Sequence, residues 1–202
     1  MDDLAATVTS VGLRIGNLEA TPVLERPDLV AEPVFDTLRA HPDLAVGVGV
    51  AEIDPACADT ENFCAAYGVD PAVSANCVIV AGKRQGELRF AACVVLATTR
   101  TDVNTVVRRQ LDVRKVSFAP IDEAVRLAGM EYGGITPIGL PRTWPVLVDA
   151  AVAQAGRVVI GSGLRRSKLT VPTDLFSNLT EVVVLPGLGQ ARRASDTQIL
   201  NQ

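Results

Sequence analysis

Histidine and aromatic residues are scarce in this 202-residue chain, and both shortages exclude classes of chemistry. His41 is the only histidine, so a Ser-His-Asp or Cys-His mechanism would have to use that one side chain as its base. Aromatic residues make up 4% of the chain, and Val, Ala and Leu supply most of its apolar content. This composition suits sheets and small-residue packing better than a core of large rings.

Closely paired cysteines are also missing. Cys57, Cys64, Cys77 and Cys93 are 7, 13 and 16 positions apart, and none forms a CxxC pair. A structural zinc site uses closely spaced thiolates, usually with imidazole partners. We therefore interpret the cysteines as small buried apolar residues and expect no metal or organic cofactor.

Long apolar runs are absent as well. The longest, from Ala91 to Ala97, is the size of a strand, whereas crossing a bilayer takes roughly 20 apolar residues. The first residues, Met1-Asp2-Asp3-Leu4, are acidic and lead into no apolar segment of a secretory signal. We expect a cytosolic protein with no membrane partner.

Charge is distributed unevenly along the chain. The net charge of −4 argues against a general nucleic-acid binder. Residues 1–70, however, carry 13 acidic and 3 basic side chains, whereas residues 71–202 carry 10 acidic and 16 basic ones. This asymmetry indicates either a polyanion bound on one face or two differently charged solvated surfaces, and charge alone leaves both open.

The clearest secondary-structure signal is a hairpin. Two β-rich runs, residues 76–81 and 87–97, flank the turn 82–86. Asp59 is a candidate N-cap for a helix to Tyr67, with Gly68 as its C-cap. Further helices are expected over residues 33–40, 102–111, 121–127 and 173–179, and further strands over residues 44–53, 115–118, 144–148, 157–160 and 181–185.

These elements favour an α+β domain on a mixed sheet, because helices and strands do not alternate regularly. We expect residues 1–33 to form an arm packed on the domain. Residues 34–186 form the domain itself, and the polar residues 187–202 form a frayed tail.

Two glycine-rich segments could carry chemistry. Residues 133–137 (Gly-Gly-Ile-Thr-Pro), here called the first glycine turn, could expose main-chain N–H groups that polarise an ester carbonyl. Residues 161–163 (Gly-Ser-Gly), the second glycine turn, follow an expected strand and precede three cations that could hold phosphate. A tight turn without a ligand is the alternative for the first glycine turn.

Two cationic groups could face the same side of the molecule. One follows the second glycine turn, and the other flanks residues 111–113. Solvated surface charge is the alternative interpretation of each group. Asp149, at the end of an apolar strand, is a candidate carboxylate, and its alternative is an N-cap for the helix that follows.

Several motifs together resemble the YbaK/EbsC family. Gly-Gly-Ile-Thr-Pro-Ile-Gly (133–139), Trp-Pro-Val-Leu-Val-Asp (144–149) and Gly-Ser-Gly-Leu-Arg-Arg (161–166) occur in the family's order. Leu-Asp-Val-Arg-Lys (111–115) resembles the family's Leu-Asp-x-x-Lys, and residues 75–97 resemble its central hairpin. The resemblance spans roughly residues 40–185.

The resemblance implies a single α+β domain with a mixed, partly barrel-like sheet and flanking helices. Members of this family deacylate tRNA charged with the wrong amino acid, notably proline tRNA carrying alanine or cysteine, in trans to the synthetase. The implied partners are misacylated tRNA and an aminoacyl-tRNA synthetase, with monomer and homodimer both open.

The resemblance also assigns site positions. Carried over, the catalytic positions are Asn76, Gly133, Gly134, Thr136 and Asp149, and the substrate-binding positions are Pro137, Gly161, Ser162 and Gly163. The cations expected to hold the tRNA are Arg108, Arg109, Arg114, Lys115, Arg165, Arg166 and Lys168.

One position departs from the family pattern. Active editing members carry a lysine at the start of the hairpin strand, where this chain has Asn76. Asparagine offers a neutral amide in place of a positive charge. The leading hypothesis is therefore an aminoacyl-tRNA hydrolase, with a catalytically weak or inactive module that binds aminoacyl-tRNA or a small aminoacyl ligand as the alternative. A small-molecule hydrolase unrelated to tRNA is a third hypothesis.

Overall fold

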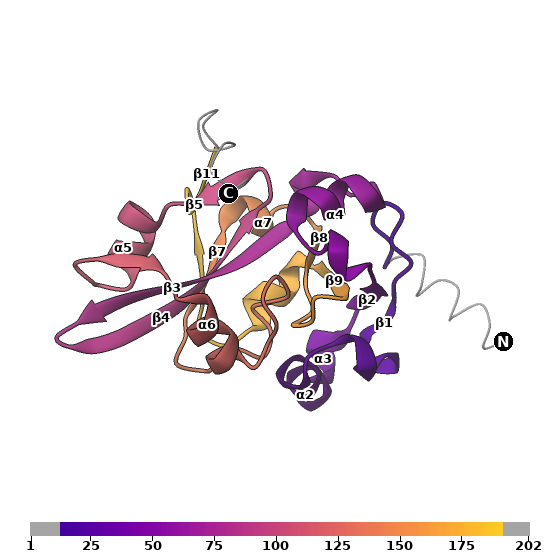
Figure 1. Cartoon of the computed structure of the whole chain (residues 1–202), viewed down its shortest axis with the longest axis horizontal. Coiled ribbons are helices and arrows are strands. Elements are labelled where there is room, and N and C mark those ends of the chain that lie inside the picture. Colours follow the sequence, from indigo (N-terminus) through magenta and orange to yellow (C-terminus); the bar gives the residue numbers. More distant parts are fainter. Residues whose placement is uncertain (1–12, 192–202) are drawn as a thin grey trace.

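The computed structural model describes residues 13–191, which form sheets with helices around them (Figure 1). The strands are β1 (Thr21–Pro22), β2 (Gly49–Glu52), β3 (Ala75–Arg84), β4 (Glu87–Leu96), β5 (Thr99–Thr101), β6 (Val116–Phe118), β7 (Val146–Asp149), β8 (Arg157–Gly161), β9 (Ser167–Pro172), β10 (Val182–Leu185) and β11 (Gly189–Ala191). The α-helices are α2 (Glu32–Ala40), α3 (Pro42–Ala45), α4 (Thr60–Tyr67), α5 (Arg108–Gln110), α6 (Ile121–Ala128) and α7 (Ala150–Ala153).

Within the described residues, the strands form two larger sheets and a small one. The first has the order β1-β2-β9-β8, and the second has the order β10-β7-β4-β3-β6. The third pairs β11 with β5. Strand β7 pairs in parallel with both β4 and β10, whereas β3 and β4 are antiparallel. The expected α+β class with a mixed sheet is confirmed.

The hairpin of β3 and β4 joins the two ends of the molecule (Figure 1). Its turn is tighter than expected, because the ladder runs to the Arg84–Glu87 pair and leaves Gln85 and Gly86 between the strands. Both turn residues have positive φ, as a two-residue hairpin turn with the right-handed strand twist requires.

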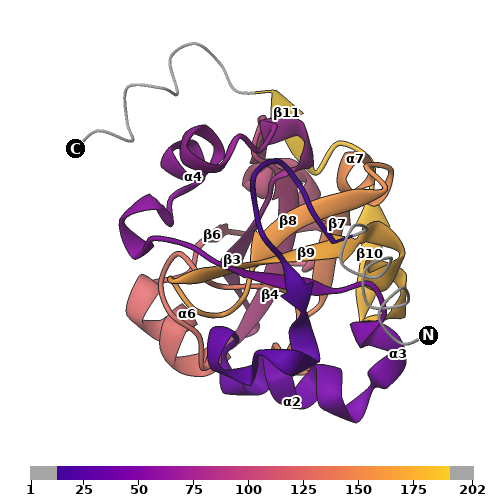
Figure 2. The ribbon, with the colours of Figure 1, turned by 90° about the vertical axis from the view of Figure 1, so that its right-hand side faces the viewer.

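The two larger sheets meet at the start of the hairpin. Ser74, just before β3, forms an isolated parallel bridge with Val159 of β8. Buried residues on one side of this junction form a core that includes Val34, Leu38 and Phe176. A second cluster, which includes Phe63, lies between α4 and the first sheet. The helices α2 and α4 cover opposite faces of the first sheet, because Val34 of α2 packs in the cluster that contains Val158 of β8 and Phe63 of α4 packs in the one that contains Val159 (Figure 2).

Local signals predicted α4 well. Asp59 is its N-cap and accepts a hydrogen bond from the Asn62 N–H, and Gly68 is its C-cap with φ of 60°. The helix α6 likewise ends at Gly129 in the left-handed conformation. A residue without a Cβ adopts this conformation at low cost.

Several elements differ from the prediction. Strand β2 covers only the end of the expected residues 44–53, because Pro42 begins α3 and Gly47 turns the chain with φ of 71°. Strand β9 was not expected, although it lies in the middle of the first sheet. Residues 189–191, expected in the frayed tail, pair with β5 as β11. Residues 1–12 of the arm and 192–202 of the tail lie outside the described residues.

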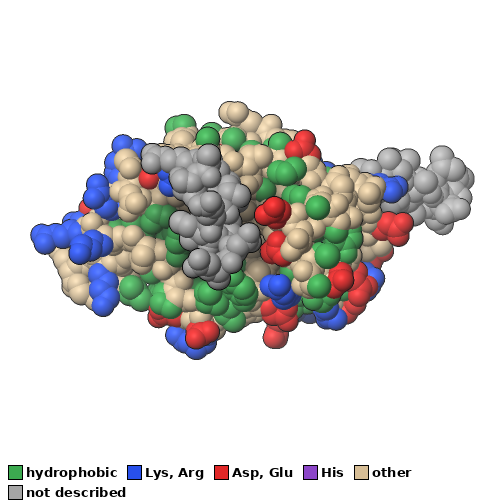
Figure 3. All heavy atoms as spheres, turned by 45° about the horizontal axis from the view of Figure 1, so that its top comes forward, with side chains coloured by type: hydrophobic (Ala, Val, Ile, Leu, Met, Phe, Trp, Pro, Cys, Tyr) green, Lys and Arg blue, Asp and Glu red, His purple; other side chains and the backbone are tan. Residues whose placement is uncertain are grey.

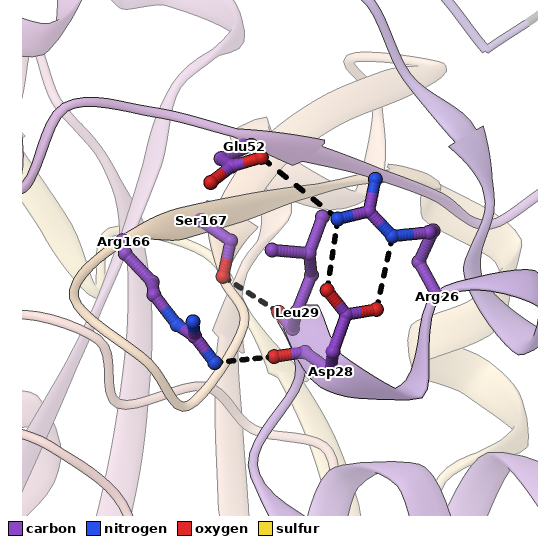
Figure 4. A network of polar contacts seen from close by, with 6 residues as sticks. All are labelled: Arg26, Asp28, Leu29, Glu52, Arg166 and Ser167. Carbon is purple, nitrogen blue, oxygen red and sulfur yellow. Dashed lines mark hydrogen bonds and ion pairs between the residues drawn. The ribbon is translucent and has the colours of Figure 1, made fainter.

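The arm contacts the start of β9 (Figure 4). The Arg166 guanidinium donates to the Asp28 carbonyl at 2.6 Å, and the Ser167 hydroxyl donates to the Leu29 carbonyl at 2.6 Å. Arg26 and Asp28 form an exposed ion pair beside these contacts. The Ala31 N–H donates to the Ser162 carbonyl at 3.1 Å. The described part of the arm therefore packs against the second glycine turn.

Candidate functional site

The two glycine turns lie in direct contact. The Gly163 N–H donates to the Gly134 carbonyl at 2.7 Å. A Cβ at Gly161 would collide with that same carbonyl oxygen and would lie 2.6 Å from the Ile135 carbonyl. A Cβ at Gly134 would lie 2.7 Å from the Leu164 backbone. The backbones can approach this closely only because glycine occupies both positions.

The contact differs from the expected one in its polarity. The first turn directs carbonyl oxygens of Gly134 and Ile135 at Gly161. The Gly134 N–H donates to the Glu131 carbonyl at 3.0 Å, so this amide is used within the turn. The Ser162 hydroxyl is also engaged internally, with Ser167 at 2.8 Å. The Gly134 amide and the Ser162 hydroxyl therefore have internal partners already.

Asn76 lies on the same face as the glycine contact. Side chains alternate along strands, so Asn76 shares a face with Ser74, and Gly161 shares a face with Val159. Because Ser74 and Val159 are bridge partners, Asn76 and Gly161 are the next residues along that face.

Lys168 completes this row. It is the cross-strand partner of Gly161, with Ala51 of β2 on its other side. Residues directly opposite one another in an antiparallel pair point to the same face, with Cβ atoms about 5 Å apart. Asn76, Gly161 and Lys168 therefore occupy adjacent positions across three strands. We call this set the β3–β8–β9 row.

The N-terminus of α4 covers both ends of the row. The Thr60 hydroxyl donates to Asn76 Oδ1 at 2.6 Å. Two residues earlier, the Ala58 carbonyl accepts from Lys168 Nζ at 3.0 Å. The first residues of α4, the row and the first glycine turn thus form one cluster, and we take it as the candidate site.

Lys168 lies in a different place from that expected of an RNA-facing cation. The residue is 9% exposed, and its ammonium lies 5.2 Å from the centre of the Phe63 ring. Burial lowers the pKa of Lys168 from 10.5 to about 8. The prediction for Lys168 was wrong because strand β9 was not recognised in the sequence. In that strand the side chain points toward α4.

Thr136 and Asp149 are both buried, at different places. Thr136 is fully buried, and its hydroxyl makes no hydrogen bond among the described residues. Asp149 is the N-cap residue of α7, but its side chain makes no capping hydrogen bond. A Cβ at Gly189 would lie 2.7 Å from Asp149 Oδ2. Asp149 is therefore beneath β11 and does not contact the glycine turns in the described structure.

The two cationic groups lie at opposite ends of the hairpin. The exposed side chains of Arg108, Arg109, Arg114 and Lys115 are on or just after α5, and the Lys115 backbone packs against Gly82 near the hairpin tip. Arg165 lies beside Gly133 instead. Gly82 is six residues from Asn76, a separation of about 20 Å along a strand. The expected single cationic face is thus divided in two.

Basic side chains gather at the hairpin end of the molecule (Figure 3). Lys83, Arg84, Gln85 and Arg114 line a hollow of about 500 Å³ there. Sequence reasoning did not include the hairpin cations in this group. The signal was available, because Lys83 and Arg84 lie in the predicted turn.

A second hollow, of about 530 Å³, adjoins the loop that continues from the first glycine turn, residues 137–144. Its lining includes Pro137, Leu140 and Trp144, with His41 and Thr180 from other elements. Of the predicted site residues, it contains Pro137 alone. The loop from the first glycine turn onward therefore borders two regions, the row on one side and this hollow on the other.

Residues 54–179 match the model of the aminoacyl-tRNA editing domain family. The match covers more than half of the chain, so the protein belongs to this family. The resemblance to YbaK/EbsC proteins is thereby confirmed.

Solved structures share the fold. The hypothetical protein APE2540 is 20% identical, with a TM-score of 0.67 over 79% of this chain and 100% of its own. A proposed trans-editing enzyme for prolyl tRNA synthetase is 18% identical, with a TM-score of 0.64 over 80% of this chain and 99% of its own. At these identities the likeness establishes the fold alone. In residues 13–191, no helix has the length and apolarity that a membrane span needs.

Proposed function

We propose that this protein hydrolyses the ester of misacylated tRNA in trans. Water adds to the ester carbonyl carbon, and the bond from that carbon to the ribose oxygen breaks. The ribose oxygen takes up a proton that derives from the attacking water, and the products are the free amino acid and deacylated tRNA. Membership of the editing-domain family supports this reaction, and the cytosol is where it would take place.

The observation that carries the proposal is the contact between the glycine turns. Gly134 and Gly161 meet without side chains between them, beside the polar side chains of Asn76 and Lys168. Thr136 adds a buried hydroxyl that lacks a partner in residues 13–191. Such a group is costly unless a ligand satisfies it. Together these groups suit a small, uncharged polar function such as an ester.

The adjoining hollow supports a place for the tRNA end. Its volume of about 530 Å³ lies in the range typical of small-ligand sites. Pro137 borders it, in agreement with the role that the family resemblance gives to this residue, which is to hold the terminal adenosine. The hairpin cations would then bind phosphates further along the acceptor stem.

The test is a deacylation assay on a panel of mischarged tRNAs, beginning with proline tRNA charged with alanine or cysteine. We expect at least one mischarged tRNA to be hydrolysed well above its spontaneous rate. Correctly charged prolyl-tRNA is the control and should be spared. No turnover with any member of the panel would contradict the proposal.

A non-catalytic binding module is the second candidate, and Asn76 favours it. This residue stands where active members carry lysine, and its carbonyl oxygen is already bonded to Thr60. Such a module would bind mischarged tRNA without releasing the amino acid. Binding without turnover across the panel would select this alternative.

A further inference from the structure

Lys168 has an unusual environment for a lysine. An ammonium group has three N–H donors, and among residues 13–191 a single acceptor is present, the Ala58 carbonyl. No carboxylate in that part of the chain lies within ion-pair distance of its nitrogen. Burying a charge with so few partners is costly. Buried titratable groups of this kind concentrate at functional sites.

Lys168 lies beside the contact between the two glycine turns. Gly161, its cross-strand partner, carries no side chain that could separate the ammonium from the first glycine turn. The carbonyls of Gly134 and Ile135 lie over that glycine. Asn76 is the next residue on the other side of Gly161 in the row. It occupies the position where active family members carry a lysine. One N–H donor of the first glycine turn, that of Gly134, already bonds the Glu131 carbonyl.

We infer that Lys168 is a catalytic residue whose ammonium donates a hydrogen bond to the carbonyl oxygen of the scissile ester. This inference rests on the proposed function. When water adds to the carbonyl carbon, the carbonyl electron pair moves onto that oxygen. The ammonium stabilises the resulting oxyanion and keeps its own proton. A cation from β9 thus replaces the one that is absent from β3.

Three groups besides the ester affect the charge on Lys168. Burial lowers its pKa most, the nearby Arg165 lowers it further, and Cys64 and Asp59 raise it. Burial also raises the pKa of the Cys64 thiol, so that group stays neutral near pH 7. The ammonium form is therefore present below about pH 8, and the stabilisation should be lost above it.

The first test is single-turnover deacylation by Lys168→Met, which keeps the length and apolarity of the side chain but removes the ammonium. We expect a loss of about 100- to 1,000-fold, the scale seen when one oxyanion donor is removed. Arg39→Met, an exposed cation on α2 paired with Asp36, is the matched control and should retain full activity. A wild-type rate in folded Lys168→Met would overturn the inference.

A rescue variant separates catalysis from packing. In Asn76→Lys/Lys168→Met the cation returns to the row from the opposite side of Gly161. We expect the double variant to recover at least about tenfold of the lost rate, because the charge again faces the same contact. If Lys168 merely supported α4, lysine at position 76 would restore nothing, and this result would overturn the inference.

Binding of an inert analogue separates this inference from the proposed function. The probe is an adenosine that carries the amino acid through an amide at the 3′ position, which cannot be hydrolysed as an ester. Wild-type affinity should fall at least about tenfold between pH 7 and pH 9.5, and Lys168→Met should lack this dependence. Lysine-dependent binding without turnover contradicts the hydrolase and leaves Lys168 as a binding residue with no catalytic role. Turnover with no lysine dependence of binding or rate supports the hydrolase and overturns the role of Lys168. The absence of both turnover and lysine dependence overturns both.

Discussion

At the scale of single residues, the site depends on where one positive charge lies. Asn76 bonds to Thr60, the first residue of α4, and Lys168 bonds to Ala58, two residues before that helix. The ammonium contacts a ring face and one carbonyl, an arrangement that stabilises it weakly compared with a carboxylate partner. The fold tolerates this cost, as proteins commonly do at functional positions.

The cost of Lys168 should be visible in the pH dependence of stability. Its pKa is about 8 in the folded protein and about 10.4 when unfolded. Between these values the unfolded chain binds more protons, so the unfolding free energy should rise with pH, by up to about 3 kcal/mol. The penalty is complete below pH 8 and gone by about pH 10.4.

Urea unfolding at several pH values measures this effect. Lys168→Met should lack the rise, so the difference between the two proteins should change across that range. A difference that stays constant from pH 7 to pH 10.5 would show that Lys168 is not buried as a charge.

The residue chemistry could be predicted only in part. Motif context made Asn76 and the glycines candidate site residues. Burial of Lys168 could not be identified from its neighbours Arg165 and Arg166, because its partner Ala58 is 110 positions away in the sequence. One local signal was available. In Lys168-Leu169-Thr170-Val171, polar and apolar residues alternate as in a half-buried strand.

At the scale of elements, the approach of the first glycine turn to β8 determines the shape of the site. Gly161→Ala should displace residues 134–135, because the added Cβ meets backbone oxygens that cannot rotate away. Overpacking of this kind costs about 1–3 kcal/mol. The decrease in unfolding free energy, measured by chemical denaturation, checks it.

Gly156→Ala is the control at the other end of the same strand. A Cβ there would meet nothing within 4 Å, although its φ of 75° makes alanine strained. Both variants should therefore be destabilised, but only Gly161→Ala should lose affinity for the amide analogue. Equal analogue binding by both would mean that the turn does not contact the ligand.

Prediction of the elements succeeded where local signals were strong. The hairpin and α4 have alternation, caps and terminal glycines within a few residues of each other. Strand β11 could not be predicted in this way, because Gly189, Gln190 and Ala191 have little strand propensity and depend on pairing with β5. The junction between the sheets at Ser74 and Val159 joins segments 85 positions apart and has no local signature.

At the scale of the whole molecule, the hairpin separates the chemistry from the cations. The row lies at its start, and the basic group of Arg108, Arg109, Arg114 and Lys115 lies near its tip (Figure 1). A tRNA whose 3′ end reaches the row could place backbone phosphates along this length. The charge asymmetry of the sequence is consistent with such an arrangement.

Arg114→Ala/Lys115→Ala should weaken tRNA binding and reduce the slope of log affinity against log salt by about 1 to 2, because up to two phosphate contacts are lost. Filter binding or fluorescence anisotropy at several salt concentrations measures this slope. Affinity for the amide analogue should not change, since it has no phosphate. An unchanged salt slope would exclude the hairpin end from the RNA interface.

The most direct test of the account as a whole is the single-turnover rate of amino-acid release from mischarged tRNA, compared among wild type, Gly161→Ala and Gly156→Ala. We expect wild type and Gly156→Ala to release the amino acid, and Gly161→Ala to lose this activity. Release that persists at the wild-type rate in folded Gly161→Ala would contradict the claim that the ester is cleaved where the glycine turns meet.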